Sequence, residues 1–197
     1  MNFIKSFYRE NRKLFSSVVL VWMCASLAGI VYASKIEGES FSALSKIISD
    51  SFSEAPDIGK MIGQSFASKM ELLTGVIIAS TTPAFSPLIY FLSAFCGFST
   101  GVSCALVIRM YSLKGALVNL TIHILPLSLS LPLYFMLFVS GLKFSFIPRK
   151  LILTEKVSER RRQWVSYILL QSAITLCIFM INVTETFLCR NIITFLN

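Results

Sequence analysis

The sequence predicts an all-α fold, a polytopic bundle of transmembrane helices, and three observations lead to this prediction. The first is the run of residues 72–108, which contains no charged side chain. The second is a composition with 55% hydrophobic and only 14% charged residues, outside the usual range of a soluble domain. The third is that the other uncharged runs long enough to span a bilayer lie at 14–34, 115–142 and 163–184. We expect residues 1–197 to form one integral membrane domain.

The first span is expected at 14–34. It has a basic start and the small-residue pattern Val31-Tyr32-Ala33 before Ser34, features that also occur in signal peptides. Its apolar core is longer than the roughly 7 to 15 residues typical of a signal peptide. We therefore interpret this segment as the first helix of the bundle.

The segment 35–69 is expected to lie outside the cytoplasm and to form two short amphipathic helices on either side of Pro56. In one interpretation, both helices lie on the outer membrane surface or cap the bundle. In the other, the first helix presents an apolar stripe to a partner protein. The residues of this candidate docking stripe are Phe41, Leu44, Ile47, Ile48 and Phe52.

Residues 72–108 are expected to cross the membrane twice. As one helix, the run would measure about 55 Å at ~1.5 Å per residue, against a hydrocarbon core of about 30 Å. Pro83 and Pro87 favour a reversal there, which gives spans at 70–86 and 87–108. The second of these spans carries small side chains at intervals of four, a pattern that permits close packing against a helix of the same chain or of a second copy. These helix-packing candidates are Ser93, Gly97, Gly101 and Ala105.

The fourth and fifth spans are expected at 116–141 and 164–184, joined by a basic loop at 143–163. Pro126 and Pro132 bracket the sequence Leu-Ser-Leu-Ser in the fourth span. Proline and serine at this spacing predict a kink or a break in the helix. The helix-kink candidates are therefore four prolines: Pro83, Pro87, Pro126 and Pro132.

The basic residues predict an N-in, C-out topology, because basic loops stay in the cytoplasm. Two clusters, before the first span and between the fourth and fifth, must then be separated by an even number of crossings. Their members are Lys5, Arg9, Arg12 and Lys13, and Lys143, Arg149, Lys150, Lys156, Arg160, Arg161 and Arg162. Glu71 and Arg109 are expected at outer span ends. No charged residue is expected deep in a span, which argues against an ion or proton pathway.

Residues able to carry chemistry are few. His123 is the sole histidine, and it is expected to hydrogen-bond a backbone carbonyl freed by Pro126. The five cysteines have no metal-ligand spacing, and the sequence has no phosphate-binding loop, zinc-protease helix or nucleophile elbow. We expect no catalytic residue, metal or cofactor. Membrane lipids are expected partners and nucleic acid is not, because no basic surface is interleaved with aromatic residues.

The order of Pro87, Gly97, Gly101, Gly115 and Leu125-Pro126 resembles the family of stage II sporulation protein M. The layout is also similar, with a basic N-terminus, one span, an extracytoplasmic segment, a Gly-rich hairpin and a Pro-containing fourth helix. The resemblance implies a non-enzymatic scaffold in a bacterial cell membrane, at the sporulation septum or the engulfing membrane. Its implied partners are stage II sporulation proteins P and D, which remodel septal peptidoglycan during engulfment of the forespore.

A function of a different class is also compatible with the sequence. Five helices with short loops, a Pro-containing fourth helix and the basic loop at 143–163 suit a permease subunit of a transporter that works with a separate ATPase. The loop would then dock the ATPase, whereas in the simpler interpretation it only determines topology. Homo-oligomerisation is compatible with either function.

Overall fold

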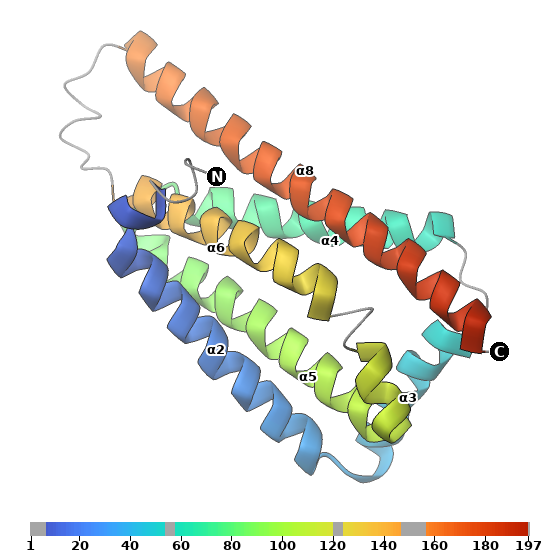
Figure 1. Ribbon diagram of the computed structural model, residues 1–197. Helices are drawn as coiled ribbons and strands as arrows, with labels where there is room; N and C mark the ends of the chain where they lie inside the picture. The colour runs from blue at the N-terminus through green and yellow to red at the C-terminus, as the bar shows by residue number, and fades with distance from the viewer. Residues whose placement is uncertain (1–6, 54–57, 120–123, 147–156, 197) are drawn as a thin grey trace.

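The fold is known from a computed structural model, which describes residues 7–53, 58–119, 124–146 and 157–196. These residues form helices and no strand, so the all-α prediction is confirmed. Figure 1 shows long helices running side by side in one bundle, with the short α3 at the end where α2 finishes. The elements are α2 (Arg12–Lys35), α3 (Gly38–Ser53), α4 (Ile58–Ala79), the 3-10 helix η1 (Pro83–Phe85), α5 (Ser86–Asn119), α6 (Leu125–Ser145) and α8 (Val157–Leu196).

Four helical segments in the described part of the chain are long and apolar enough to cross a membrane, so the protein is membrane-embedded. They are Arg12–Lys35, Pro83–Met110, Leu125–Ser145 and Arg161–Phe187. These segments coincide with four of the five predicted spans. The predicted span at 70–86 falls on α4 and the turn after it. That helix carries Lys60, Lys69 and Glu71, and it is not among the four.

Of the two short amphipathic helices predicted at 35–69, the first is present and the second is part of a longer helix. The first is α3, which begins at Gly38, whose φ of 66° lets the chain turn out of α2. The second segment continues into the apolar residues that follow it, so that α4 is one helix from Ile58 to Ala79. No proline interrupts this stretch, and its three glycines are tolerated in a helix. Pro56, the expected break, lies outside the described residues.

The reversal predicted within residues 72–108 is found as a hairpin of α4 and α5 (Figure 1), whereas a membrane crossing by α4 stays a prediction. α4 ends at Ala79, and the amide of Ser80 donates to the carbonyl of Val76 at 2.9 Å. Pro83 then begins η1 and Pro87 lies in the first turn of α5, positions where a missing amide hydrogen costs no helical bond.

The boundary between the third and fourth predicted spans is wrong. α5 continues to Asn119, because the residues around Gly115 are helical rather than a loop, and α6 begins only at Leu125. Pro126 lies in the first turn of α6 and Pro132 inside it, and the described helix is continuous between them, without the expected break. Only Pro132 removes an internal helical hydrogen bond. The basic loop is also shorter than predicted, since Lys143 lies in α6 and Arg160–Arg162 in α8.

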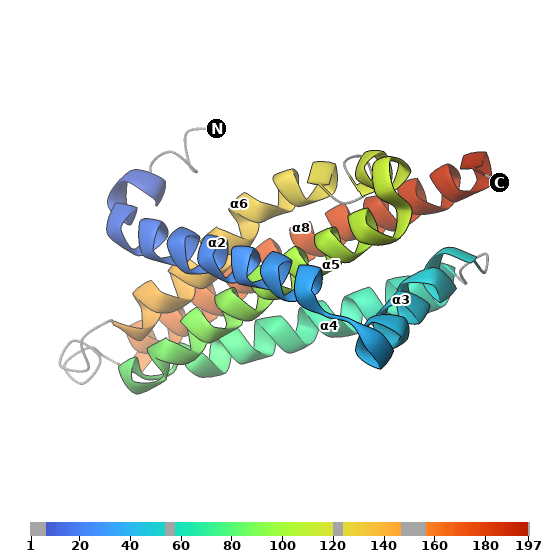
Figure 2. The same cartoon turned by 90° about the horizontal axis from the view of Figure 1, so that it is seen from below.

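α6 is the central helix, and its C-terminal half is buried among α2, α4, α5 and α8. Figure 2 shows the same bundle from below, with α2 along α5 and α8 behind α6. Long apolar side chains fill this part of the core, and Phe135 of α6 meets Phe15 and Trp22 of α2 edge to face. The fully buried residues of the core include Leu137, Phe138, Val139, Leu142, Val18, Val76 and Ile89.

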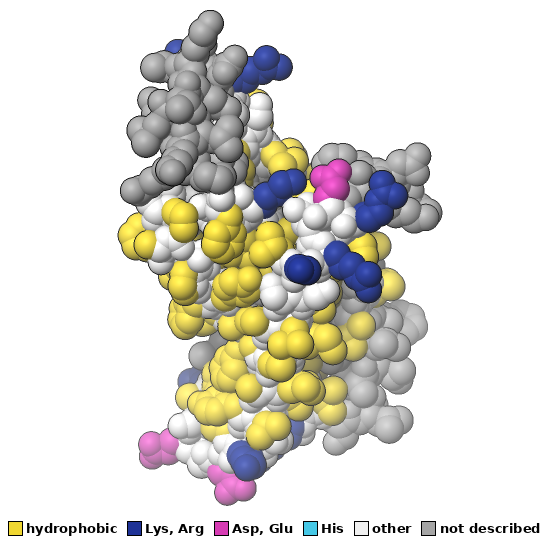
Figure 3. All heavy atoms as spheres, turned by 90° about the vertical axis from the view of Figure 1, so that its left-hand side faces the viewer, with side chains coloured by type: hydrophobic (Ala, Val, Ile, Leu, Met, Phe, Trp, Pro, Cys, Tyr) yellow, Lys and Arg dark blue, Asp and Glu magenta, His cyan; other side chains and the backbone are white. Residues whose placement is uncertain are grey.

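Charged side chains gather toward the ends of the bundle, with hydrophobic side chains between them (Figure 3). The start of α2 and the end of α6 share one end, where Lys143 Nζ lies 3.8 Å from a carboxylate oxygen of Glu10. The described residues at the start of α2 and the end of α6 therefore place parts of both basic clusters at the same end, which is consistent with an even number of crossings between them. α8 finishes at the opposite end (Figure 1). That the basic end is cytoplasmic stays a prediction.

Candidate functional site

The predicted stripe of small residues on α5 packs against α2 of the same chain. A Cβ added to Gly97 would meet the carbonyl oxygen of Trp22, and one added to Gly101 would meet that of Ser26. Ser26 also donates its hydroxyl to the carbonyl of Gly97, with 2.9 Å between the oxygens. Small residues allow this backbone contact, as in other membrane helix pairs. Of the two interpretations of the stripe, the contact within one chain is the one found.

The other members of the stripe are less closely packed or lack a polar partner. Ser93 is fully buried and its hydroxyl has no hydrogen-bond partner among the described residues. Ala105 is half-buried. The sequence reasoning missed Gly29 of α2, where an added Cβ would meet the carbonyl oxygen of Phe98. The signal for it was present, since Gly29 and Ala33 repeat the same spacing of four.

All five long helices contribute to one pocket of about 220 Å³, which we name the five-helix pocket. Its apolar side includes Trp22 and Phe95. Its remaining lining is rich in hydroxyl, amide and charged groups, an unusual concentration of polarity inside a membrane bundle. The polar residues around it are Ser68, Lys69, Ser99, Thr100, Ser130, Tyr134, Asn182 and Glu185.

Lys69 lies within the bundle rather than at the end of a helix. α4 runs from Ile58 to Ala79, so Lys69 is near the middle of this helix, about 15 Å from its C-terminal end at ~1.5 Å per residue. Its ammonium nitrogen lies 5.3 Å from the ring centroid of Tyr134 in α6, a cation–π contact. Lys69 was expected to end the extracytoplasmic segment 35–69, and the structure instead places it in the lining of a pocket between the helices. The expectation that no charged residue lies deep in a span stays a prediction.

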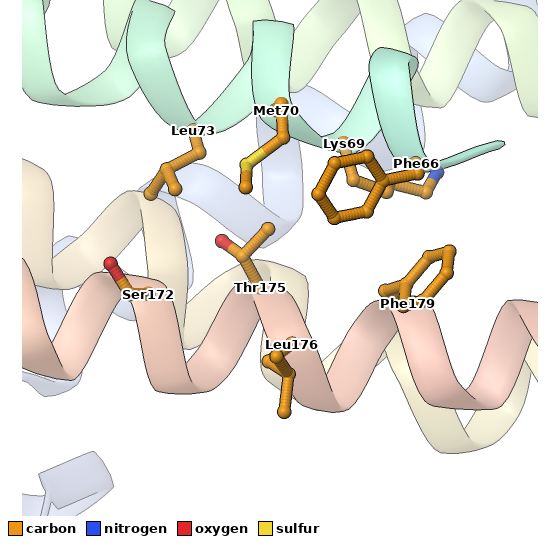
Figure 4. A pocket seen from close by; sticks show the side chains of 8 residues that line it. All are labelled: Phe66, Lys69, Met70, Leu73, Ser172, Thr175, Leu176 and Phe179. Atoms are coloured by element: carbon orange, nitrogen blue, oxygen red, sulfur yellow. The ribbon is translucent and has the colours of Figure 1, made fainter. Parts of the chain in front are cut away.

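A second pocket, of about 100 Å³, lies between α4 and α8 and shares Lys69 with the first. Figure 4 shows Phe66, Met70 and Leu73 of α4 facing Thr175 and Phe179 of α8 across this α4–α8 pocket. Phe66 and Phe179 close one end, with ring centroids 5.3 Å apart. Met70 and Leu176 are 42% and 61% exposed, so the pocket opens on the outer surface of the bundle.

Thr175 is 6% exposed, and its hydroxyl has no hydrogen-bond partner among the described residues. Threonine hydroxyls in helices usually donate to a carbonyl one turn earlier. Thr74, Thr100 and Thr186 do so here, with 2.8, 2.8 and 3.0 Å between the oxygens. Thr175 is thus a buried donor that lines the α4–α8 pocket and has no protein acceptor in the described structure.

Arg109 of α5 joins α2, α3 and α5 at one end of the bundle. Its guanidinium donates to the carbonyls of Ala33 and Ile36 at 3.1 and 2.6 Å and lies 4.3 Å from the ring centroid of Phe41. A cation at the last carbonyls of α2 also interacts favourably with the helix dipole. Glu71, the other residue expected at an outer span end, is exposed on α4.

The contact with Arg109 directs part of the predicted docking stripe onto the bundle. Phe41 and Leu44 are half-buried, as expected for a helix that caps the bundle. The exposed residues of α3 include Glu39, Ser42 and Ala43. The side chains of the three remaining stripe residues, Ile47, Ile48 and Phe52, lie outside what the structure describes.

A buried hydrogen-bond network that sequence reasoning missed links α4, α6 and α8. Tyr167 donates to Ser80 at 2.8 Å, and the amide nitrogen of Gln171 donates to Tyr167 at 2.9 Å and to Ser140 at 3.0 Å. Gln171 is fully buried, and the same nitrogen reaches the carbonyl of Leu137 at 3.3 Å. Interhelical bonds of this kind contribute about 0.6–1.7 kcal/mol each in membrane proteins. This network fixes the packing of the three helices.

Among the described residues, no group of histidine, cysteine or acidic side chains could hold a metal ion. Cys24 and Cys177 are exposed free thiols, and Cys96 and Cys104 are partly buried ones. Cys96 lines the five-helix pocket. His123, and the side chain of Cys189, lie outside the described part of the chain. Comparison with protein-family models, curated proteins and solved structures finds no match for this chain.

Proposed function

We propose that the protein is a non-enzymatic membrane scaffold that positions peptidoglycan-remodelling enzymes. The observation that carries this proposal is the contact of Arg109, which holds α3, a helix outside the membrane-crossing segments, against α2 and α5. A docking helix fixed in this way loses less conformational entropy when it binds a partner than a free segment would. The apolar stripe of α3, whose described members Phe41 and Leu44 are only half-buried, would meet the partner.

The resemblance to the stage II sporulation protein M family supplies the identity of the proposed partners. These are stage II sporulation proteins P and D, at the sporulation septum or the mother cell's engulfing membrane. The exposed apolar face of α2 is a further contact surface, suited to a partner's membrane anchor. It includes Leu20, Met23, Leu27 and Val31, which are 63%, 55%, 61% and 51% exposed.

Affinity purification from native membranes of tagged protein tests the scaffold. Leu44→Asp combined with Ile48→Asp should abolish recovery of peptidoglycan hydrolases, because two charges would disrupt the apolar contact of α3. Ser42→Asp combined with Ala43→Asp places the same charges on exposed positions of α3 and serves as the control. Equal hydrolase recovery from the parent protein and the Leu44/Ile48 variant would refute docking through the apolar stripe.

A transporter subunit is the second candidate, and the five-helix pocket favours it. A polar cavity bounded by all the long helices, with a lysine in its lining, is a feature expected along a substrate pathway. In this function the cytoplasmic ATPase would dock near the end of α6 and the start of α8. The same purification discriminates the two candidates, since recovery of an ATPase that is lost in an Arg161→Glu and Arg162→Glu variant would support transport.

A further inference from the structure

We propose that the two pockets, which share Lys69 in their lining, bind one anionic phospholipid. The phosphate would lie at the ammonium group of Lys69, and an acyl chain would lie in the α4–α8 pocket. This inference goes beyond the scaffold, and it holds whether or not the partner proteins dock on α3.

The first argument is the chemistry on the two sides of Lys69. On one side, the α4–α8 pocket is bounded mainly by apolar side chains, among them Leu73 and Phe179. On the other, the five-helix pocket offers hydroxyl and amide groups such as those of Ser130 and Asn182. A ligand that occupies both pockets must be apolar at one end and polar at the other. This is the description of a lipid.

The second argument is access. Met70 and Leu176 line the α4–α8 pocket and are both exposed, so the pocket is open to the surface of the bundle. α8 is one of the four segments able to cross the membrane, and these residues lie along it and its neighbour α4. Lipid chains are the solvent at such a surface. A ligand from the bilayer can therefore enter laterally, without crossing water.

The third argument is the pair of polar groups that face the pockets. Lys69 supplies a positive charge that lies over the ring of Tyr134, and this contact leaves ammonium hydrogens to bind phosphate oxygens. Thr175 supplies a buried hydroxyl with no acceptor in the described structure, and an ester carbonyl of a lipid would satisfy it. Glu185, the acid that also lines the five-helix pocket, already has an interaction of its own. Among the described residues that line the two pockets, Lys69 is the one cation, and it is the group that would bind the lipid phosphate.

Fluorescence quenching by brominated lipids tests the proposal on the full chain. The reporter is Phe179→Trp, in a background where Trp22 and Trp164 are replaced by Phe, so that the single tryptophan lines the α4–α8 pocket. The protein is reconstituted in phosphatidylcholine vesicles containing increasing fractions of brominated phosphatidylglycerol or brominated phosphatidylcholine. We expect the anionic lipid to be favoured about fivefold, as one cation meeting an anionic lipid contributes about 1 kcal/mol.

The variants assign this preference to the pockets. Lys69→Gln should abolish the preference for the anionic lipid, so that the two lipids quench about equally. Lys60 is an exposed lysine on the same helix, and Lys60→Gln should leave the preference unchanged. Lys69→Arg keeps the charge and should keep the preference. Ser172→Phe fills the α4–α8 pocket and should remove the preference with Lys69 intact. Circular dichroism and gel filtration verify that each variant is folded, and the arginine and Ser172 variants keep the test decisive if Lys69→Gln does not fold.

Three outcomes would overturn the inference. The first is equal quenching by the two brominated lipids in the reporter protein. The second is an equal loss of preference in the Lys60 and Lys69 variants, which would indicate a general effect of surface charge. The third is loss of the preference when inorganic phosphate is added, with brominated phosphatidylcholine then quenching as well as the anionic lipid. That result would assign the Lys69 site to a free phosphate rather than to a lipid headgroup.

Discussion

Replacing Gly101 with alanine tests the backbone contact between α2 and α5. The added methyl would overlap the carbonyl oxygen of Ser26, and it would lie 2.9 and 3.1 Å from the carbonyl carbon and Cα of the same residue. All three are backbone atoms, so no side-chain rotation relieves the overlap. Carbon atoms prefer a separation of about 3.5–4.0 Å, so the helices must separate by roughly 0.5–1 Å.

The expected cost follows from this separation. Overpacking of a tight interface costs about 1–3 kcal/mol, and alanine regains about 0.5–1 kcal/mol as a better helix former than glycine. We expect Gly101→Ala to lower the free energy of unfolding by ~1–2 kcal/mol. The measurement is unfolding in mixed dodecylmaltoside and SDS micelles, followed by tryptophan fluorescence, since Trp22 lies at this interface.

The control is Gly63→Ala on α4. A Cβ added to Gly63 meets nothing within 4 Å, so this variant should be as stable as the parent or more stable by about 0.5–1 kcal/mol. A combined Gly29→Ala and Gly101→Ala variant should lose less than the sum of the single losses, because one helix separation relieves both overlaps. Equal stability of the Gly101 and Gly63 variants would refute the close packing.

Three further predictions concern other parts of the bundle. Arg109→Gln should lower the free energy of unfolding by about 1 kcal/mol and speed limited proteolysis within α3, whereas exposed Arg161→Gln should change neither. Gln171→Leu should shift micellar unfolding by no more than about 1 kcal/mol, while Gln171→Ala, which leaves a cavity, should cost ~2 kcal/mol or more. In a cysteine-free chain, Ser42→Cys should react with an impermeant maleimide added outside intact cells and Arg161→Cys only after lysis. The reverse labelling would contradict the N-in topology.

The helical hairpin of α4 and α5 could be predicted because it depends on two quantities that are visible in the sequence. One is the length of an uncharged run compared with the thickness of a bilayer, and the other is the position of prolines that cannot continue a helix. The end of α5 could not be predicted in the same way. Arg109 resembles the end of a span, yet it contacts Ala33 and Phe41 while the helix continues to Asn119. Both contacts join residues that are distant in the sequence, so the residues around Arg109 do not reveal them.

The candidate site was harder to predict, because it depends on where helices end and how they rotate. Lys69 was expected to end the extracytoplasmic segment 35–69, before a span at 70–86, whereas α4 runs from Ile58 to Ala79 and places Lys69 near its middle. The helix-packing stripe was visible at Gly97 and Gly101, but its partner required the matching Gly29 of α2 to be noticed. A pocket bounded by five helices has no local sequence signal, since its members lie between Trp22 and Glu185.

The contact between α2 and α5 also bears on how the chain is assembled during synthesis. The hydrogen bond from Ser26 to Gly97 joins residues 71 positions apart, so α2 enters the membrane well before its partner exists. At about 5–20 residues per second, this interval lasts several seconds. During it, Gly29 and the hydroxyl of Ser26 face lipid or the insertion machinery. A nascent chain that stops before α5 would keep this face uncovered, a state that a membrane chaperone or protease could recognise as unfinished.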